Sequence, residues 1–265
     1  MRSKVVLTIA GSDAIAGAGI QADLKTFAAM GVYGVSAITA ITAQNTAGVV
    51  DVLPCSPDIV RSQIEAIAGD VDVAAAKTGM LATADIVIVT ADAVERLGKV
   101  PLVVDPVMAA GRQGRTLLAP DAVSILKSRL LPLATVVTPN AAEAAVLSGT
   151  VVDSLASARQ AAERIHQYGV TAVVVKGGHL TGTDAVDVLF YAGEFMEFAA
   201  PRAKVGDVHG TGCSFASAIA ARLALGDDIP TAVEHGKRYV AGAIAHSFEI
   251  GRGARILNHF WELSL

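Results

Sequence analysis

The sequence predicts an α/β protein with a mostly parallel central sheet and helices on both of its faces. Short apolar runs rich in Val and Ala alternate with longer stretches of helical pattern along almost all of the 265 residues. Hydrophobic residues make up 52% of the chain and aromatic residues only 5%, which suits parallel strands buried under Ala-rich helices. Parallel neighbours need a crossover connection that is usually a helix, so the alternation favours repeated βαβ units.

Six short apolar runs are the expected parallel strands, and longer segments with helical periodicity lie between them. The strands are predicted at residues 5–10, 35–41, 73–77, 102–105, 136–138 and 172–176. The helices are predicted at residues 18–30, 57–67, 84–97, 121–131 and 154–168. Ser56 is a typical N-cap, Pro57 fits a first helical position, and Gly169 ends the last of these helices.

The last third of the chain departs from this rhythm. Residues 189–191 and 194–198, joined by Ala192 and Gly193, predict a small antiparallel hairpin. Two further helices are expected at residues 213–225 and 231–248. Because no low-complexity linker or internal repeat divides the sequence, we expect one domain over residues 1–265.

Charge and composition argue against several classes of partner. The formal net charge is −4 and no run of basic residues is present, which disfavours a nucleic-acid partner. No segment reaches the roughly 18 consecutive apolar residues of a membrane span. The two cysteines, Cys55 and Cys213, are too few for a disulfide scaffold or a cysteine zinc cluster. We therefore expect a cytoplasmic protein with neither a nucleic-acid nor a membrane partner.

Polar residues follow the predicted strands where a buried sheet has no need of them. They are Gly11-Ser12-Asp13, Gln44-Asn45, Lys77-Thr78-Gly79, Asp105-Pro106, Thr138-Pro139-Asn140 and Lys176-Gly177-Gly178. Ligands of open parallel sheets bind beyond the carboxyl ends of the strands, so this pattern predicts a small-molecule site there.

Two of these residues carry charges that a buried strand end tolerates only with a partner. Asp105 ends an apolar run and Lys176 follows three valines, which favours metal or phosphate chemistry for both. Glu143 stands three residues beyond Asn140, where it can reach a hydrated Mg²⁺ or simply favour a helix N-terminus. The residues alone leave both roles of Glu143 open.

The segment His209-Gly210-Thr211-Gly212-Cys213, which leads into a predicted helix, is the strongest single signal. Two glycines let successive backbone N–H groups point at one place at the positive end of a helix, which is typical of an anion site. An ordinary glycine-rich turn before a buried helix is the alternative. Cys213 is expected to have a lowered thiol pKa there, unless it is only a small buried apolar residue.

Together these motifs resemble the hydroxymethylpyrimidine/phosphomethylpyrimidine kinases of the thiamine pathway, in the ribokinase superfamily. The resemblance rests on motifs that run in the family's order over nearly the whole chain. They are Thr8-Ile9-Ala10-Gly11-Ser12-Asp13, Gly17-Ala18-Gly19-Ile20-Gln21-Ala22-Asp23, Thr42-Ala43-Gln44-Asn45-Thr46, Ala76-Lys77-Thr78-Gly79-Met80, Val104-Asp105-Pro106-Val107-Met108, Thr138-Pro139-Asn140, Lys176-Gly177-Gly178-His179 and His209-Gly210-Thr211-Gly212-Cys213. It implies a three-layer α/β/α ribokinase-like fold, and a kinase that uses ATP and Mg²⁺, as a homodimer. The implied reaction phosphorylates 4-amino-5-hydroxymethyl-2-methylpyrimidine and then converts its monophosphate to the diphosphate.

The resemblance also implies a role for each matching residue. The pyrimidine would be bound by Gly11, Asp23, Gln44, Met80 and Val107, with Gln44 hydrogen-bonding the polar edge of the ring. ATP would contact Asn140 and Lys176, while Asp105 and Glu143 would serve the metal. Gly210, Thr211 and Gly212 would form the anion hole, with Cys213 as base where sugar kinases of this superfamily carry aspartate.

Three segments differ from the family pattern, at residues 14–16, 111–115 and 251–255, which bears on substrate breadth and closure of the site. Pyridoxal kinase is the alternative within the same fold, because its substrate is also a flat ring with a primary alcohol. An NAD-dependent oxidoreductase is a weaker alternative, since residues 17–22 fit a dinucleotide-binding pattern but the acid expected after the next strand is missing. A non-catalytic pyrimidine-binding module is a third.

Overall fold

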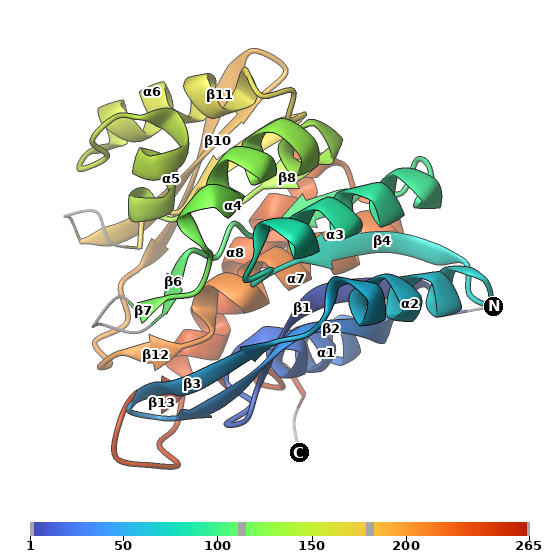
Figure 1. Ribbon diagram of the computed structural model, residues 1–265. Helices are drawn as coiled ribbons and strands as arrows, with labels where there is room; N and C mark the ends of the chain where they lie inside the picture. Colours follow the sequence, from blue (N-terminus) through green and yellow to red (C-terminus); the bar gives the residue numbers. More distant parts are fainter. Residues whose placement is uncertain (1–2, 111–114, 179–182, 264–265) are drawn as a thin grey trace.

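A computed structural model describes residues 3–110, 115–178 and 183–263, and its centre is a nine-stranded sheet (Figure 1). The strand order is β11-β10-β9-β8-β5-β4-β1-β2-β3. The parallel strands are β1 (Val5–Asp13), β2 (Tyr33–Asn45), β4 (Val73–Thr78), β5 (Leu102–Val104), β8 (Val136–Val137) and β9 (Ala172–Val175). Antiparallel strands extend both edges: β3 (Gly48–Pro54) beside β2, and β10 (Asp184–Tyr191) with β11 (Glu194–Pro201) beside β9.

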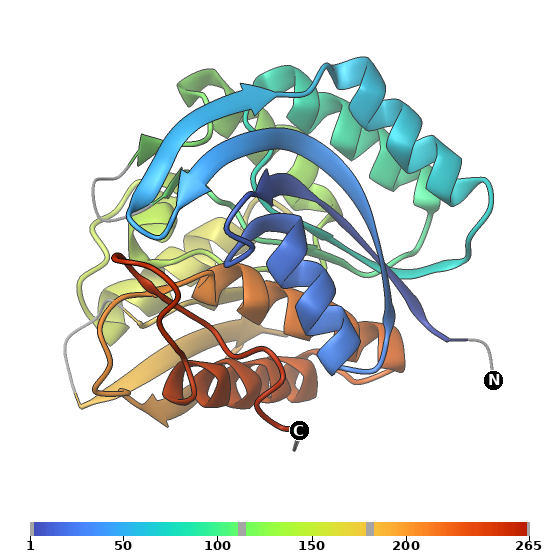
Figure 2. The same ribbon diagram turned by 90° about the horizontal axis from the view of Figure 1, so that it is seen from below.

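Helices cover both faces of this sheet (Figure 2). One face carries α2 (Pro57–Ala68), α3 (Ala84–Leu97), α4 (Pro120–Ile125), α5 (Ala141–Ser148) and α6 (Leu155–His166), and the other carries α1 (Gly19–Ala29), α7 (Thr211–Leu225) and α8 (Ile229–Ala245). Successive side chains of a strand point to opposite faces, so Leu7 of β1 packs into the first core and Val6 into the second. The predicted three-layer α/β/α arrangement, with a mostly parallel central sheet and an antiparallel hairpin at one edge, is confirmed.

Helix boundaries follow the capping signals where these are clear. α3 has its predicted bounds because the Thr83 hydroxyl accepts the N–H of Ile86 at 3.3 Å, and Gly98, with a φ of 76°, ends it. The helix predicted at residues 121–131 is not continuous. α4 passes into a π-helical turn over Leu126–Leu130 and a 3₁₀ turn over Leu131–Leu133, where Pro132 cannot donate a helical hydrogen bond.

Several short strands were not expected from the sequence. β3 is an edge strand whose Val50 and Leu53 are 65% and 68% exposed, so it lacks the buried apolar face that marks the others. β6 (Ala109–Ala110) pairs with β7 (Arg115–Thr116), and β12 (Val208–His209) pairs with β13 (Arg255–Ile256). Of the altered segment 111–115, only Arg115 lies within the described residues.

The parallel strands end along one edge, where the residues after them come together with the start of α7 (Figure 1). This is the edge at which an open α/β sheet binds its ligands. Within the described part of the chain, no helix has the length and apolar character needed to cross a membrane.

Candidate active site

A broad cleft of about 1860 Å³ opens at the carboxyl ends of the strands. Almost every residue assigned to the site from the sequence lines it. These are Gly11, Gln44, Met80, Asp105, Val107, Asn140, Glu143, Lys176, Gly210, Thr211, Gly212 and Cys213. Residues separated by up to about two hundred positions are thus brought to one place by the parallel topology, as the pattern of strand exits predicted.

The start of α7 forms one wall of the cleft. Gly210 is its N-cap, with a φ of 84°, and no side chain caps the helix, so the first backbone N–H groups are left for a ligand. A side chain at Gly210 would overlap the carbonyl of Gly17, and a Cβ at Gly212 would lie 3.0 Å from Nζ of Lys176. Gly210 therefore lets the loop that contains Gly17 pack against the helix start, and Gly212 keeps open a space between the backbone donors and Lys176.

Asp105 and Lys176 form an ion pair beside this loop, with Nζ 2.8 Å from Oδ1. Lys176 is 15% exposed at its side chain and Asp105 only 2%, so the pair lies at the floor of the cleft. Burial opposes the charge on Lys176, but Asp105 and Glu143 outweigh it and raise the lysine pKa. A permanent cation thus faces the helix start, where a phosphate would need its charge neutralised.

Asn140 and Glu143 begin α5 as a capping box. The Asn140 side chain accepts the N–H of Glu143 at 2.9 Å, and Oε2 of Glu143 accepts the N–H of Asn140 at 2.8 Å. Burial raises the pKa of Glu143 to about 7, and Asp105 adds to this while Lys176 opposes it. The two residues therefore order a helix, and the Glu143 carboxyl still faces the cleft beside the ion pair.

A protein-only metal cage is absent from the part of the chain that the structure describes, where no three His, Cys, Asp or Glu side chains form a metal-binding group. Magnesium does not require one, because it usually keeps several waters and is held by one or two carboxylates together with substrate phosphates. Asp105 and Glu143 supply two carboxylates on the same wall of the cleft. The residues present fit a magnesium ion that arrives with a nucleotide.

Cys213 lies in the first turn of α7 and lines the cleft, but its predicted acidity is wrong. Burial raises the thiol pKa to about 11, and the charges of Asp105 and Asp23 add to this effect. Lys77 and a hydrogen bond from the Gly19 backbone lower the pKa, but by less than burial and the two carboxylates raise it. The position at a helix N-terminus predicted a lowered pKa, whereas loss of hydration dominates at this thiol.

Asp23 does not line the cleft, so the structure does not support its expected contact with the substrate ring. Its carboxylate is fully buried and accepts from Lys77 Nζ at 2.9 Å to both oxygens, from Thr8 Oγ1 at 2.6 Å and from Ser217 Oγ at 2.7 Å. Lys77 received no role from the sequence, although it ends a buried strand as Lys176 does. The same cost of burying a charge would have singled it out.

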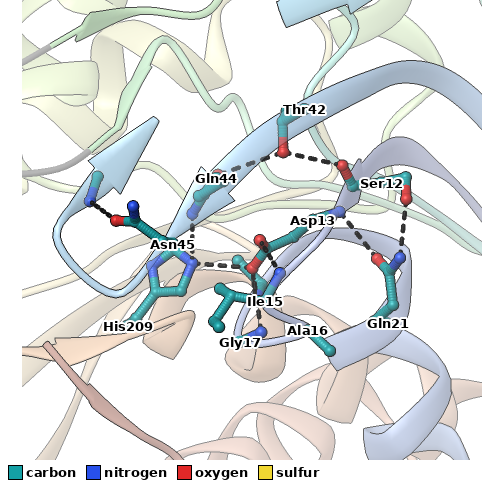
Figure 3. Close-up of polar contacts among 12 residues, drawn as sticks. Ser12, Asp13, Ile15, Ala16, Gly17, Gln21, Thr42, Gln44, Asn45 and His209 are labelled. Atoms are coloured by element: carbon teal, nitrogen blue, oxygen red, sulfur yellow. Dashed lines mark hydrogen bonds and ion pairs between the residues drawn. The ribbon is translucent and has the colours of Figure 1, made fainter. Parts of the chain in front are cut away.

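Asp13, Gln44 and His209 line one part of the cleft and contact one another there (Figure 3). Asp13 accepts the backbone N–H groups of residues 15, 17 and 18 at 3.0, 3.0 and 2.8 Å, and Nε2 of His209 lies 2.9 Å from its Oδ2. The Gln44 amide contacts the same Nε2 at 2.7 Å. No function was assigned to Asp13 or His209 from the sequence, although both belong to motifs that carried the resemblance.

The sequence of this chain is similar to those of known kinases. The sequence model of the phosphomethylpyrimidine kinase family matches residues 13–258. The hydroxymethylpyrimidine/phosphomethylpyrimidine kinase of Rhizobium meliloti is 50% identical over 260 residues, which cover 97% of each chain. The thiamine biosynthesis bifunctional protein ThiED of Geobacter sulfurreducens is 46% identical over 96% of this chain, which spans only 52% of that longer protein.

Among solved structures, an ADP complex of Bacillus subtilis pyridoxal kinase has a TM-score of 0.93 and 37% identity, covering 99% of this chain and all of the other. The fold is thus shared with pyridoxal kinases, while the sequence likeness to pyrimidine kinases is higher. The resemblance drawn from the motifs is confirmed, and the dinucleotide-binding alternative has no support. This chain belongs to the phosphomethylpyrimidine kinase family, with a ribokinase-like fold.

Proposed function

We propose that this kinase transfers the γ-phosphoryl group of ATP to the hydroxymethyl oxygen of 4-amino-5-hydroxymethyl-2-methylpyrimidine, and a second group to the resulting monophosphate. The observation that carries the proposal is a single cleft lined by Gln44, the Asp105–Lys176 pair and the start of α7. Family membership supports the substrate, and the likeness to a pyridoxal kinase solved with ADP supports the use of ATP.

The chemistry required of the protein is mostly positioning and charge neutralisation, because phosphoryl transfer passes through a loose transition state. The bond from the γ-phosphorus to the β–γ bridging oxygen breaks, a bond to the substrate oxygen forms, and the alcohol proton leaves. Lys176 and the backbone donors at Gly210, Thr211 and Gly212 would bind the phosphate oxygens. Asn140 would contact the nucleotide from the start of α5.

Magnesium, when bound, would neutralise part of the phosphate charge, and Asp105 and Glu143 are the residues that would hold it. Cys213 would be the base that receives the alcohol proton, which requires its thiolate form. Gly11, Met80 and Val107, which line the cleft, would enclose the ring. Gly11 packs closely against Met80, because a Cβ at Gly11 would lie only 3.2 Å from Sδ of Met80. Gln44 would hydrogen-bond the ring's polar edge.

Product analysis with three acceptors tests this function. Purified protein with ATP and Mg²⁺ is given the pyrimidine, its monophosphate or pyridoxal, and the products are identified by mass. We expect one added phosphate on the first substrate and a diphosphate from the second. Pyridoxal deserves inclusion because of the high structural likeness to pyridoxal kinase. Phosphorylation of pyridoxal with neither pyrimidine converted would overturn the proposal in favour of a pyridoxal kinase.

We further propose a cytoplasmic homodimer built from one catalytic domain over residues 1–265. The two cysteines are free thiols, in keeping with a reducing compartment. Ile41 of β2 and its cross-strand partner Leu53 of β3 are 54% and 68% exposed, which leaves an apolar surface on the outer arm of the sheet. Light scattering should report twice the chain mass, and Leu53→Glu should shift the protein to monomer. A monomeric wild type would exclude the dimer.

A further inference from the structure

The contact between His209 and Gln44 raises a question of hydrogen placement. In the structure the Gln44 amide turns its nitrogen toward Nε2 of His209, at 2.7 Å, and its oxygen toward Oγ1 of Thr42, at 3.4 Å (Figure 3). An amide nitrogen can only donate and an amide oxygen can only accept. This orientation therefore needs a lone pair on Nε2 and a hydroxyl hydrogen from Thr42.

Nε2 of His209 has no lone pair to give. It lies 2.9 Å from Oδ2 of Asp13, and a carboxylate at that distance requires a hydrogen on the nitrogen. Asp13 is ionised: burial opposes its charge, but the His209 contact and the backbone donors of the 13–18 loop outweigh burial and lower the carboxyl pKa. Because Nε2 carries this hydrogen, it cannot accept one from the Gln44 amide nitrogen, and toward both neighbours it can act only as a donor.

Thr42 gives the same answer independently. Its hydroxyl has one hydrogen, and it donates that hydrogen to the carbonyl oxygen of Ser12 at 3.0 Å. Its second contact, with the Gln44 amide, can then only be one in which Thr42 accepts. Both neighbours of the amide thus require the opposite orientation, with the oxygen toward His209 and the nitrogen toward Thr42. A half turn about the last side-chain bond exchanges the two ends without moving the side chain.

We propose that His209 is a positioning residue that fixes the direction of the Gln44 amide, so that Gln44 offers an N–H donor to the substrate ring. The hydrogen bonds form one directed chain. Nε2–H of His209 donates to the Asp13 carboxylate and to the Gln44 carbonyl, the Gln44 NH₂ donates to Thr42, and Thr42 donates to Ser12. The second hydrogen of the Gln44 NH₂ group is left for the cleft that Gln44 lines.

This orientation specifies what the substrate must present, an inference that rests on the proposed function. An N–H donor at Gln44 can pair with a ring nitrogen that carries a lone pair. It cannot pair with an exocyclic amino group, which is itself a donor. His209 also directly precedes Gly210 of the phosphate-binding loop, and β12 pairs it with Ile256 of β13. The residue that sets the ring contact is therefore attached to the segment that would receive the phosphate.

The hydrogen placement can be read directly in the free protein, without substrate. ¹⁵N-histidine labelling of the whole chain gives tautomer-specific nitrogen signals, and the spectrum of His209→Gln identifies those of His209. We expect a hydrogen on Nε2 at neutral pH, whether the ring is neutral or cationic. A neutral ring with its hydrogen on Nδ1 would overturn the proposal. Because no substrate is present, this outcome is independent of whether the enzyme phosphorylates pyrimidines.

Kinetics of matched variants test the consequence for binding. His209→Leu removes the donor, whereas His209→Gln keeps an N–H close to the position of Nε2. We expect His209→Leu to raise the KM of the pyrimidine about tenfold, with kcat and the KM of ATP within a few-fold of wild type. His209→Gln should restore most of the affinity. In a Gln44→Leu background, His209→Leu should have no further effect on the pyrimidine KM.

A purely structural role of His209 predicts a different pattern. Because the residue adjoins the phosphate loop, general damage would raise the KM of ATP together with that of the pyrimidine, and the loss would persist in the Gln44→Leu background. Either result would overturn the positioning role. If the tautomer is as expected but neither pyrimidine is phosphorylated, the proposed function fails while the hydrogen-bond chain stands.

Discussion

Two aspartate–lysine pairs lie near the carboxyl ends of the parallel strands, and their surroundings differ. Lys77 of β4 pairs with Asp23 of α1, whereas Asp105, after β5, pairs with Lys176, after β9. In the Asp23–Lys77 pair both side chains are fully buried, and Thr8 and Ser217 also donate to the carboxylate. In the Asp105–Lys176 pair the lysine side chain is 15% exposed and lines the cleft, and within the described residues the one other side-chain donor to the carboxylate, the Thr138 hydroxyl, is 3.4 Å away.

We interpret this difference as a division of roles, in which the Asp23–Lys77 pair serves stability and the Asp105–Lys176 pair serves the proposed reaction. Asp23 has its hydrogen-bonding capacity filled by protein groups, so it has nothing to offer a substrate. Asp105 keeps free capacity toward the cleft, and Lys176 faces a helix start that lacks a cap. A saturated buried pair contributes to folding, whereas an unsaturated pair at a cleft is available for ligands. The following predictions test this division.

Removing the lysine of the buried pair should have the largest effect, and on stability. Lys77→Met keeps the length of the side chain but leaves the Asp23 carboxylate without a counter-charge where water cannot reach it. We expect the free energy of unfolding to fall by about 3–5 kcal/mol, measured by urea denaturation. Lys77 is also the group that most lowers the pKa of Cys213, so kcat should fall in this variant as well if the thiolate is the base. Unchanged stability would show that Asp23 finds another partner.

Lys176→Met is the matched substitution at the cleft, and its effect should fall on catalysis. It removes a cation that would neutralise the transferring phosphate, which we expect to lower kcat/KM about 10²–10³-fold. Stability should fall much less than in Lys77→Met, because water in the cleft can solvate Asp105. A loss of stability equal to that of Lys77→Met, with activity preserved, would mean that the two pairs do not differ in purpose.

Much of the fold was predictable because it depends on local signals. Apolar runs located the parallel strands, and α3 was bounded by a threonine cap and a glycine stop. β3 was missed because an exposed edge strand has no buried face to leave a pattern. The break after α4 depends on Pro132, which can be read from the sequence, but the π turn before it depends on tertiary packing.

The site residues were predictable where a charged residue ends a buried strand, and not where a property depends on burial that the sequence does not show. Asp105 and Lys176 were found because each ends a buried strand. Asp23 was misplaced because it lies within a helix, where the sequence does not show that its carboxylate is buried and already paired with Lys77. The acidity of Cys213 was misjudged because its position at a helix start is visible in sequence, whereas the burial that outweighs it is not.

The pH dependence of turnover tests whether Cys213 acts as the base beside the open pair. With a thiol pKa of about 11, the thiolate fraction and therefore kcat should rise about tenfold per pH unit below that value. Between about pH 8.5 and 10, Glu143, with a pKa of about 7, has already lost its proton, and Lys176 stays charged because its pKa is raised. Cys213→Ala should abolish the rise. A flat wild-type profile, with folding verified by circular dichroism, would exclude the thiolate base.

The smallest effects should come from replacing the threonines that donate to each carboxylate. These substitutions remove one hydrogen bond from each aspartate and leave its lysine partner in place. Thr8→Val removes a 2.6 Å hydrogen bond to fully buried Asp23 and nearly preserves side-chain volume. Hydrogen bonds to charged groups contribute about 1.5–3 kcal/mol, so unfolding should become easier by that amount. Thr138→Val removes only the 3.4 Å contact to Asp105, whose carboxylate can recover a water from the cleft. We expect a loss below about 1 kcal/mol for this variant.

Equal losses in the two variants, measured by urea denaturation under the same conditions, would show that Asp105 is as completely satisfied by the protein as Asp23 is. The cleft pair would then have no spare capacity for a metal or a phosphate, and its assignment to catalysis would have to rest on Lys176 alone.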